Sequence, residues 1–245
     1  MDFLKSILIW LLGITFIIVC FPITCLIWLA AIPFDRKRKA IHWALVYQSY
    51  FFAKLMPVWD LTIEGREKAV PKETYIIISN HQSILDIVFI NCLRYRYKWI
   101  SKIEIMKKPL LGWYLRMAGY ITVNRGDKES KEEMLAKSYD CLQKGTSIML
   151  FPEGTRSLDG EIGFFKRGAF QLAISTKKPI LPILLDGTGK SLPKHGFILH
   201  GSQKIKIRVF DPVPVESFNA NDPDTLALNF NTFMTEALKK MRAGK

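Results

Sequence analysis

His81 and Asp86 are the two residues whose types and spacing most clearly suggest a catalytic pair. They belong to segment 80–86, which follows an apolar, β-branched run at 75–79 and precedes the apolar residues 87–90. This pattern predicts a buried strand, a turn and a helix in that order. Two residues five positions apart on one helix would point about 140° away from each other. A contact therefore requires His81 in the turn and Asp86 in the helix.

In that geometry, the Asp86 carboxylate accepts the Nδ1 proton of His81 and leaves Nε2 free to act as a general base. A structural interpretation is also open. Asn80 or Ser83 would then cap the helix, His81 would be a hydrogen-bonded loop residue, and Asp86 would complement the helix N-terminus. The carboxyl edge of an open α/β sheet is where ligands usually bind, so either arrangement would lie at a functional position.

A second candidate segment, 151–157, has the sequence Phe-Pro-Glu-Gly-Thr-Arg-Ser and follows a predicted strand. Gly154 permits close backbone approach, Thr155 supplies donors, and the planar fork of Arg156 matches two phosphate oxygens. The segment therefore predicts a phosphate-binding site. The structural alternative is a tight turn in which the arginine and the glutamate form a surface ion pair.

Four blocks of sequence, in order across residues 80–183, resemble the lysophosphatidic acid acyltransferase family, the glycerolipid acyltransferases with an H-x4-D signature. The blocks are 80–86 with His81 and Asp86; 102–125 with Pro109-Leu110-Leu111-Gly112-Trp113 and Arg125; 151–157, a full match to F-P-E-G-T-R-S; and 179–183, similar to P-I-x-P. One such block is weak evidence, whereas four in sequence are strong evidence.

The resemblance implies acyl transfer from acyl-CoA or acyl carrier protein to the sn-2 hydroxyl of lysophosphatidic acid, giving phosphatidic acid. His81 would be the general base, oriented by Asp86, without a covalent acyl-enzyme, a cofactor or a metal. Glycerol 3-phosphate, a lysophospholipid or a lyso-aminolipid remains an alternative acceptor. A membrane-bound serine hydrolase using Ser83 is an alternative of another class, but the G-x-S-x-G elbow is missing.

The resemblance also implies roles for residues around the pair. Phosphate-binding residues would be Lys102, Arg125, Gly154, Thr155 and Arg156. Substrate-binding or supporting residues would be Asn80, Ser83 and Glu153. Lys102 and Arg125 suit either the acceptor phosphate or a pantetheine phosphate, and Asn124 replaces the acidic residue often found before this arginine in the family.

The net charge of +13 and the pI near 9.6 indicate anionic partners, such as anionic membrane lipids, phosphorylated substrates or an acidic carrier protein. We expect no nucleic-acid partner, because neither zinc-finger spacing nor an RNA-binding signature is present. We expect no metal site, because the cysteines lack C-x-x-C spacing and His195 with His200 makes only a loose pair.

The N-terminal residues predict a membrane anchor. Segment 6–34 has no charged residue and is long enough to span a bilayer, and Pro22 either kinks one crossing or breaks a hairpin. The basic residues 36–39 follow, so the positive-inside rule predicts a catalytic domain facing the cytoplasm. Segment 40–59 predicts an aromatic helix at the membrane interface, with a buried core helix as the alternative.

After residue 60, strands and helices alternate, which predicts an α/β fold with a mostly parallel mixed sheet flanked by helices. We therefore divide the chain into membrane-anchoring helices, 1–59, and an acyltransferase domain, 60–245. Segment 186–191 resembles a P-loop but lacks its first glycine, so we expect no nucleotide site. The predicted strands are 62–63, 75–79, 97–100, 120–123, 147–151, 180–185 and 204–210. The predicted helices are 84–93, 109–117, 128–143, 166–176 and 222–241.

Overall fold

One seven-stranded sheet organises the computed structural model, which describes residues 2–218 and 222–244. Its strands are β1 (Trp59–Glu64), β2 (Ile76–Ser79), β3 (Tyr97–Lys102), β4 (Ile121–Val123), β5 (Ser147–Leu150), β6 (Ile180–Asp186) and β7 (Gln203–Val209). The order across the sheet is β1-β7-β6-β2-β5-β3-β4. Strands β6, β2, β5, β3 and β4 are parallel, and β7 is antiparallel to β6. The predicted mostly parallel mixed sheet is confirmed.

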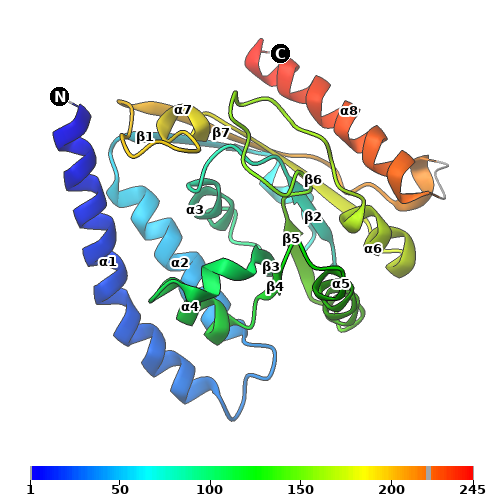
Figure 1. The fold of residues 1–245 in the computed structure, drawn as a ribbon, viewed down its shortest axis with the longest axis horizontal. Coiled ribbons are helices and arrows are strands. Elements are labelled where there is room, and N and C mark those ends of the chain that lie inside the picture. The colour runs from blue at the N-terminus through cyan, green and yellow to red at the C-terminus, as the bar shows by residue number, and fades with distance from the viewer. Residues whose placement is uncertain (1, 219–221, 245) are drawn as a thin grey trace.

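The helices are α1 (Asp2–Ala31), α2 (Lys39–Leu55), α3 (Asp86–Asn91), α4 (Leu111–Ala118), α5 (Lys128–Gln143), α6 (Gly168–Thr176), α7 (Thr188–Ser191) and α8 (Pro223–Arg242). Short 3₁₀ turns occupy Arg66–Lys68, Ile103–Lys107 and Val215–Phe218. Helices α5, α6 and α8 lie on one face of the sheet, and α2 and α3 lie on the other (Figure 1). Covered on both faces, β2 and β5 are buried along their whole length, as the continuous apolar runs predict.

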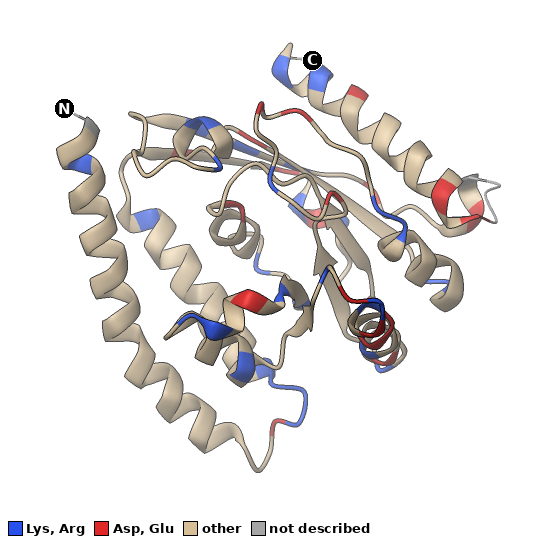
Figure 2. Ribbon diagram, in the orientation of Figure 1, with Lys and Arg blue, Asp and Glu red and all other residues tan. Residues whose placement is uncertain are grey.

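Helix α1 runs without interruption through Pro22. The structure thus contains a single helix here, and the hairpin alternative is wrong. By length and composition the helix can cross a membrane, and its apolar side chains are exposed; Leu11 is 58% exposed. Figure 2 shows α1 almost free of charged residues and the α1–α2 connection as basic.

Helix α2 ends at Leu55, so the predicted helix 40–59 is too long. Pro57 cannot continue the hydrogen-bond pattern, and Trp59 already begins β1. The helix has two different faces, which reconciles the two interpretations of its aromatic sequence. Buried side chains are Ile41, His42 and Val46; exposed ones are Tyr47, Phe51 and Leu55.

Helix α3 is shorter than the predicted helix 84–93, because the chain makes a turn up to Leu85 before the first helical residue, Asp86. Strand β1 is longer than the predicted strand 62–63, since it pairs along its whole length with β7. The remaining predicted elements agree with the structure to within about two residues, the usual uncertainty at element ends.

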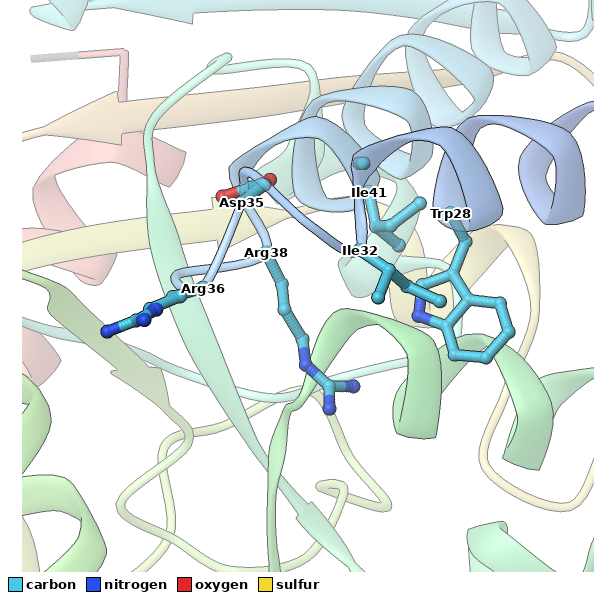
Figure 3. A pocket seen from close by; sticks show the side chains of 7 residues that line it. Trp28, Ile32, Asp35, Arg36, Arg38 and Ile41 are labelled. Carbon is cyan, nitrogen blue, oxygen red and sulfur yellow. The ribbon is translucent and has the colours of Figure 1, made fainter.

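Arg38 joins the α1–α2 turn to the rest of the fold. Its guanidinium donates to the carbonyls of Arg116 and Met117 in the last turn of α4, where carbonyls are available beyond the regular helical pattern. A cavity of about 360 Å³ lies at this turn. Trp28 and Ile32 are among the residues that line it (Figure 3). No residue of segment 80–86 lines this cavity.

Candidate active site

The ends of three adjacent strands bring the functional side chains together. Strand β2 leads into segment 80–86, β5 leads into the loop 151–167, and β6 ends at Asp186 and leads into α7. Because β6, β2 and β5 are neighbouring parallel strands, their carboxyl ends meet at one edge of the sheet. Segments about 100 residues apart in the chain thus share one site.

Asp86 contacts His81 as the spacing predicted. The distance from His81 Nδ1 to Asp86 Oδ2 is 2.7 Å, and Asp86 is fully buried. The same oxygen accepts the backbone N–H groups of Gln82 and Ser83, and the Thr188 hydroxyl donates to Oδ1. Four donors surround this carboxylate, an arrangement that stabilises its negative charge and fixes its direction.

The His81 ring lies flat on Phe151, with ring centroids 3.8 Å apart and planes at 6°. Its side chain is 15% exposed. Nε2 makes no hydrogen bond to any residue that the structure describes. With the proton on Nδ1 held by Asp86, Nε2 is an acceptor open to a substrate, which is the geometry a general base needs.

Glu153 supports the turn that carries His81. Its Oε1 accepts the backbone N–H of His81 at 2.8 Å, and its Oε2 accepts that of Gly163 at 2.9 Å. Burial raises the pKa of Glu153 to about 7, although both N–H bonds lower it. Glu153 therefore supports the site by binding backbone N–H groups, and it forms no surface ion pair with Arg156.

Asn80 and Ser83 are both committed to backbone partners. The Asn80 side chain donates to the carbonyl of Leu185 and accepts its N–H, which fastens β6 to the end of β2. The Ser83 hydroxyl donates to the carbonyl of Leu192 at 2.7 Å and is fully buried. These contacts support the local structure, and they give no geometric support to Ser83 as a hydrolase nucleophile.

Gly154 and Arg156 lie next to the His81 turn, because the N–H of Ser157 donates to the His81 carbonyl at 2.7 Å. Gly154 has φ +69°, and a Cβ there would lie 2.8 Å from Lys166 Nζ. Neither Arg156 nor Lys166 forms an ion pair or side-chain hydrogen bond within residues 2–218 and 222–244. Both cations are thus available to an anionic ligand, and Thr155, next to Arg156 in the chain, is exposed.

Lys102 and Arg125 are placed differently from the other predicted phosphate ligands. Lys102 ends β3 and forms an ion pair with Glu104 at 2.8 Å. Arg125 follows β4, which lies three strand positions, or about 14 Å, from β2. The negative charge of the same Glu104 stabilises the charged form of the Arg125 guanidinium. Lys102 lies one strand from β5, the strand that leads into the 154–156 turn, and Arg125 lies two strands from it. Glu104, which sequence analysis overlooked, offsets part of the charge of this outer pair.

Thr188, Gln82 and Phe151 are site residues whose roles sequence reasoning missed. Thr188 lies in segment 186–191, whose likeness to a P-loop gave no role to this residue. The signal that could have found it is the strand before it, because a buried parallel strand ends at the same edge as β2.

Comparisons with known proteins are consistent with this geometry. A family model described as Acyltransferase matches residues 60–186. The chloroplastic 1-acyl-sn-glycerol-3-phosphate acyltransferase of Brassica napus is 39% identical over 183 residues, which cover 71% of this chain and 51% of that protein. The Mus musculus 1-acyl-sn-glycerol-3-phosphate acyltransferase alpha is 31% identical over 196 residues, which cover 78% of this chain and 68% of that protein. This chain spans about half the length of the chloroplast relatives.

A solved structure shares the fold. The crystal structure of the 1-acyl-sn-glycerophosphate (LPA) acyltransferase PlsC from Thermotoga maritima superposes with a TM-score of 0.79 and 24% sequence identity. The match covers 97% of this chain and 96% of that one. The likeness therefore includes the N-terminal helices as well as the sheet.

Proposed function

Because this chain belongs to the acyltransferase family, we propose that it transfers an acyl group from an acyl thioester to the sn-2 hydroxyl of lysophosphatidic acid, giving phosphatidic acid. The observation that carries the proposal is the 2.7 Å contact of His81 with the buried Asp86, which leaves Nε2 open. The acceptor is supported by the names of the relatives, 1-acyl-sn-glycerol-3-phosphate acyltransferases. The donor is acyl-CoA or acyl carrier protein.

The reaction needs one proton acceptor. His81 Nε2 takes the proton of the acceptor hydroxyl as its oxygen bonds to the thioester carbonyl carbon. The resulting imidazolium is stabilised by Asp86 across the Nδ1 contact. The carbon–sulfur bond then breaks with its electron pair on sulfur, and Nε2 returns the proton to the departing thiolate. A thioester is activated enough for this direct transfer, so no acyl-enzyme is required.

The acceptor phosphate is held beside His81 by the 154–156 turn. Arg156 supplies a bidentate fork, and Lys166 adds a second cation on the same side. Both are free of protein partners in the described structure, so binding a phosphate would break no existing ion pair. Lys102 and Arg125 lie at the ends of the neighbouring strands β3 and β4 and are suited to a phosphate of the acyl donor.

Helix α1 gives the enzyme access to its lipid substrate. Its exposed apolar side chains bind the bilayer, and the basic residues 36–39 contact anionic headgroups. The acyltransferase domain then faces the cytoplasm. Both the lysophosphatidic acid and its product can remain in the membrane during the reaction.

The test uses the purified full chain in phosphatidylcholine vesicles, with acyl-CoA or acylated carrier protein and lysophosphatidic acid. Thiol release and phosphatidic acid are measured together. We expect both products in equal amounts, and only when the acceptor is present. Thiol release without an acceptor would instead indicate hydrolysis. Glycerol 3-phosphate and a lysophospholipid, supplied in parallel, test the other acceptors; no product with either donor would overturn the proposal.

A further inference from the structure

Arg242, in the last turn of α8, binds the loop that covers the His81 turn. We call residues 153–163 the site loop; it lies between the sheet edge and α8 (Figure 1). Arg242 Nη2 donates to the carbonyl of Gly160 at 2.8 Å, and Nη1 donates to Glu161 Oε1 at 2.5 Å. Nε and Nη2 also donate to Asp186 Oδ1 at 3.1 and 3.0 Å. One guanidinium thus joins α8, the site loop and the end of β6.

Gln82, next to His81, binds the same two acceptors. Its Nε2 donates to the Gly160 carbonyl at 3.1 Å and lies 3.3 Å from Asp186 Oδ1. Gln82 is 3% exposed, so its side chain has no alternative partner in water. Its backbone N–H donates to Asp86 Oδ2 at 2.7 Å. Contacts therefore run without a gap from Arg242, through Gln82, to the carboxylate that binds His81.

We propose that Arg242 is a positioning residue for acyl transfer: it holds Gly160 and Asp186 where the Gln82 side chain needs them, and Gln82 in turn fixes Asp86 against His81. This inference rests on the proposed function of the His81–Asp86 pair. The planar fork of arginine suits three acceptors, whereas a lysine ammonium on the same helix cannot reach them with the same geometry.

A second contact attaches α8 to the site loop at Gly163, three residues beyond the Gly160 contact of Arg242. The side chain of Asn231, near the middle of α8, donates to the Gly163 carbonyl at 2.7 Å. The N–H of the same Gly163 donates to Glu153. With Asn231 intact, loss of the Arg242 contacts should misplace the loop around Gly160 without detaching it. The expected defect is one of orientation at the active site.

The variants are Arg242→Gln, Arg242→Lys and the matched control Lys240→Gln. Lys240 lies in the same helical turn, is exposed, and forms no hydrogen bond or ion pair with the part of the chain that the structure describes. We expect Arg242→Gln to lower kcat by about 10- to 100-fold, since misplacement of about 1 Å can cost that much. The kcat of Arg242→Lys should lie between those of the wild type and Arg242→Gln. The kcat of Lys240→Gln should stay within about twofold of the wild type. The KM values for both substrates should change by less than about threefold.

The pH profile separates positioning from a general structural defect. A loosened Asp86 stabilises the His81 imidazolium less, so the acid limb of the kcat/KM profile should move to lower pH in Arg242→Gln. Partial unfolding would lower the amplitude and leave the position of that limb unchanged. A double variant with Gln82→Met should lose little more than Gln82→Met alone, because both changes cut the same path.

Wild-type activity keeps this test distinct from that of the proposed function. If the wild type transfers acyl groups and Arg242→Gln matches Lys240→Gln, only the role of Arg242 is overturned. An unshifted acid limb, or additive losses in the double variant, would overturn it as well. If Arg242→Gln does not fold, Arg242→Lys carries the same kinetic and pH tests. An inactive wild type would contradict the proposed function itself.

Discussion

The Glu153 carboxylate accepts the backbone N–H of His81 with one oxygen and that of Gly163 with the other, at 2.8 and 2.9 Å. One buried side chain therefore joins the turn that carries His81 to the far end of the site loop. Burial raises the pKa of Glu153 to about 7, against an ordinary value of 4.5. The charge of this link should change near neutral pH.

The stability of the protein should reflect this titration. A carboxyl group with a raised pKa in the folded chain holds its proton more tightly than in the unfolded chain. Its contribution to the free energy of unfolding therefore falls as pH rises from about 4.5 to about 7. Glu153→Gln removes the titration. The variant should lose more stability relative to wild type at pH 5 than at pH 8, by up to roughly 3 kcal/mol, measured by urea unfolding.

Asp159, in the same loop, provides the matched control. The N–H of Glu161 and the hydroxyl of Ser157 lower the pKa of Asp159, so this carboxylate stays ionised at both pH values. The effect of Asp159→Asn should be the same at pH 5 and pH 8. An equal effect of Glu153→Gln at the two pH values would show that Glu153 does not titrate in this range.

Removal of the His81 imidazole should abolish most of the acyl transfer without unfolding the protein. General-base catalysis contributes about 10²- to 10⁴-fold, so His81→Ala should lower kcat by that factor while Tm changes little. The measurement is thiol release with lysophosphatidic acid present. The control is His195→Ala, an exposed loop histidine, which should retain full activity. Substantial transfer by His81→Ala would contradict the general-base role.

Local sequence patterns predicted the site's centre because its residues are close in sequence. The apolar run before Asn80 specifies a strand, the polar turn ends it, and only four residues separate His81 from Asp86. The contact needs only this strand, turn and helix. The same local signals predicted the sheet class, since strands alternating with helices favour parallel pairing.

The residues around the pair were missed because the tertiary fold, and not the local sequence, brings them to the site. Thr188 lies 102 residues from Asp86, and Arg242 lies 82 residues from Gly160. No local sequence motif around Thr188 or Arg242 predicts its partner. The pairing of Lys102 with Glu104 was also missed, because the resemblance directed attention to basic residues only. Long-range polar contacts therefore had to come from the structure.

The guanidinium of Arg156 should bind the acceptor phosphate, so its removal should affect one substrate only. A charge-assisted hydrogen bond contributes about 1.5–3 kcal/mol, which corresponds to roughly 10- to 150-fold. Arg156→Gln should lower kcat/KM for lysophosphatidic acid by about that factor, mostly through KM, and leave KM for acyl-CoA within about twofold. Steady-state kinetics with each substrate varied in turn provide the measurement.

Arg167→Gln is the control for Arg156. Arg167 is an exposed cation at the end of loop 151–167, and among the described residues its side chain forms a single ion pair, 3.9 Å from Asp224. Exposed pairs of this kind contribute little, so its loss should leave both KM values unchanged. Equal effects of the two substitutions would indicate general electrostatic attraction in place of a phosphate site at Arg156.

Helix α1 should bind lipid through its exposed apolar side chains. Leu11 is 58% exposed on this helix, and a lysine there would have to enter the bilayer at a cost of about 2.5–3.5 kcal/mol at its centre. Leu11→Lys should therefore weaken vesicle binding by roughly tenfold or more in co-sedimentation. Leu228→Lys makes the same chemical change at a 60% exposed leucine on α8 and should bind vesicles as the wild type does. If both variants bind vesicles equally well, α1 is not the membrane anchor. A lysine on a helix embedded in the bilayer would weaken vesicle binding, whereas a lysine on α8 would not.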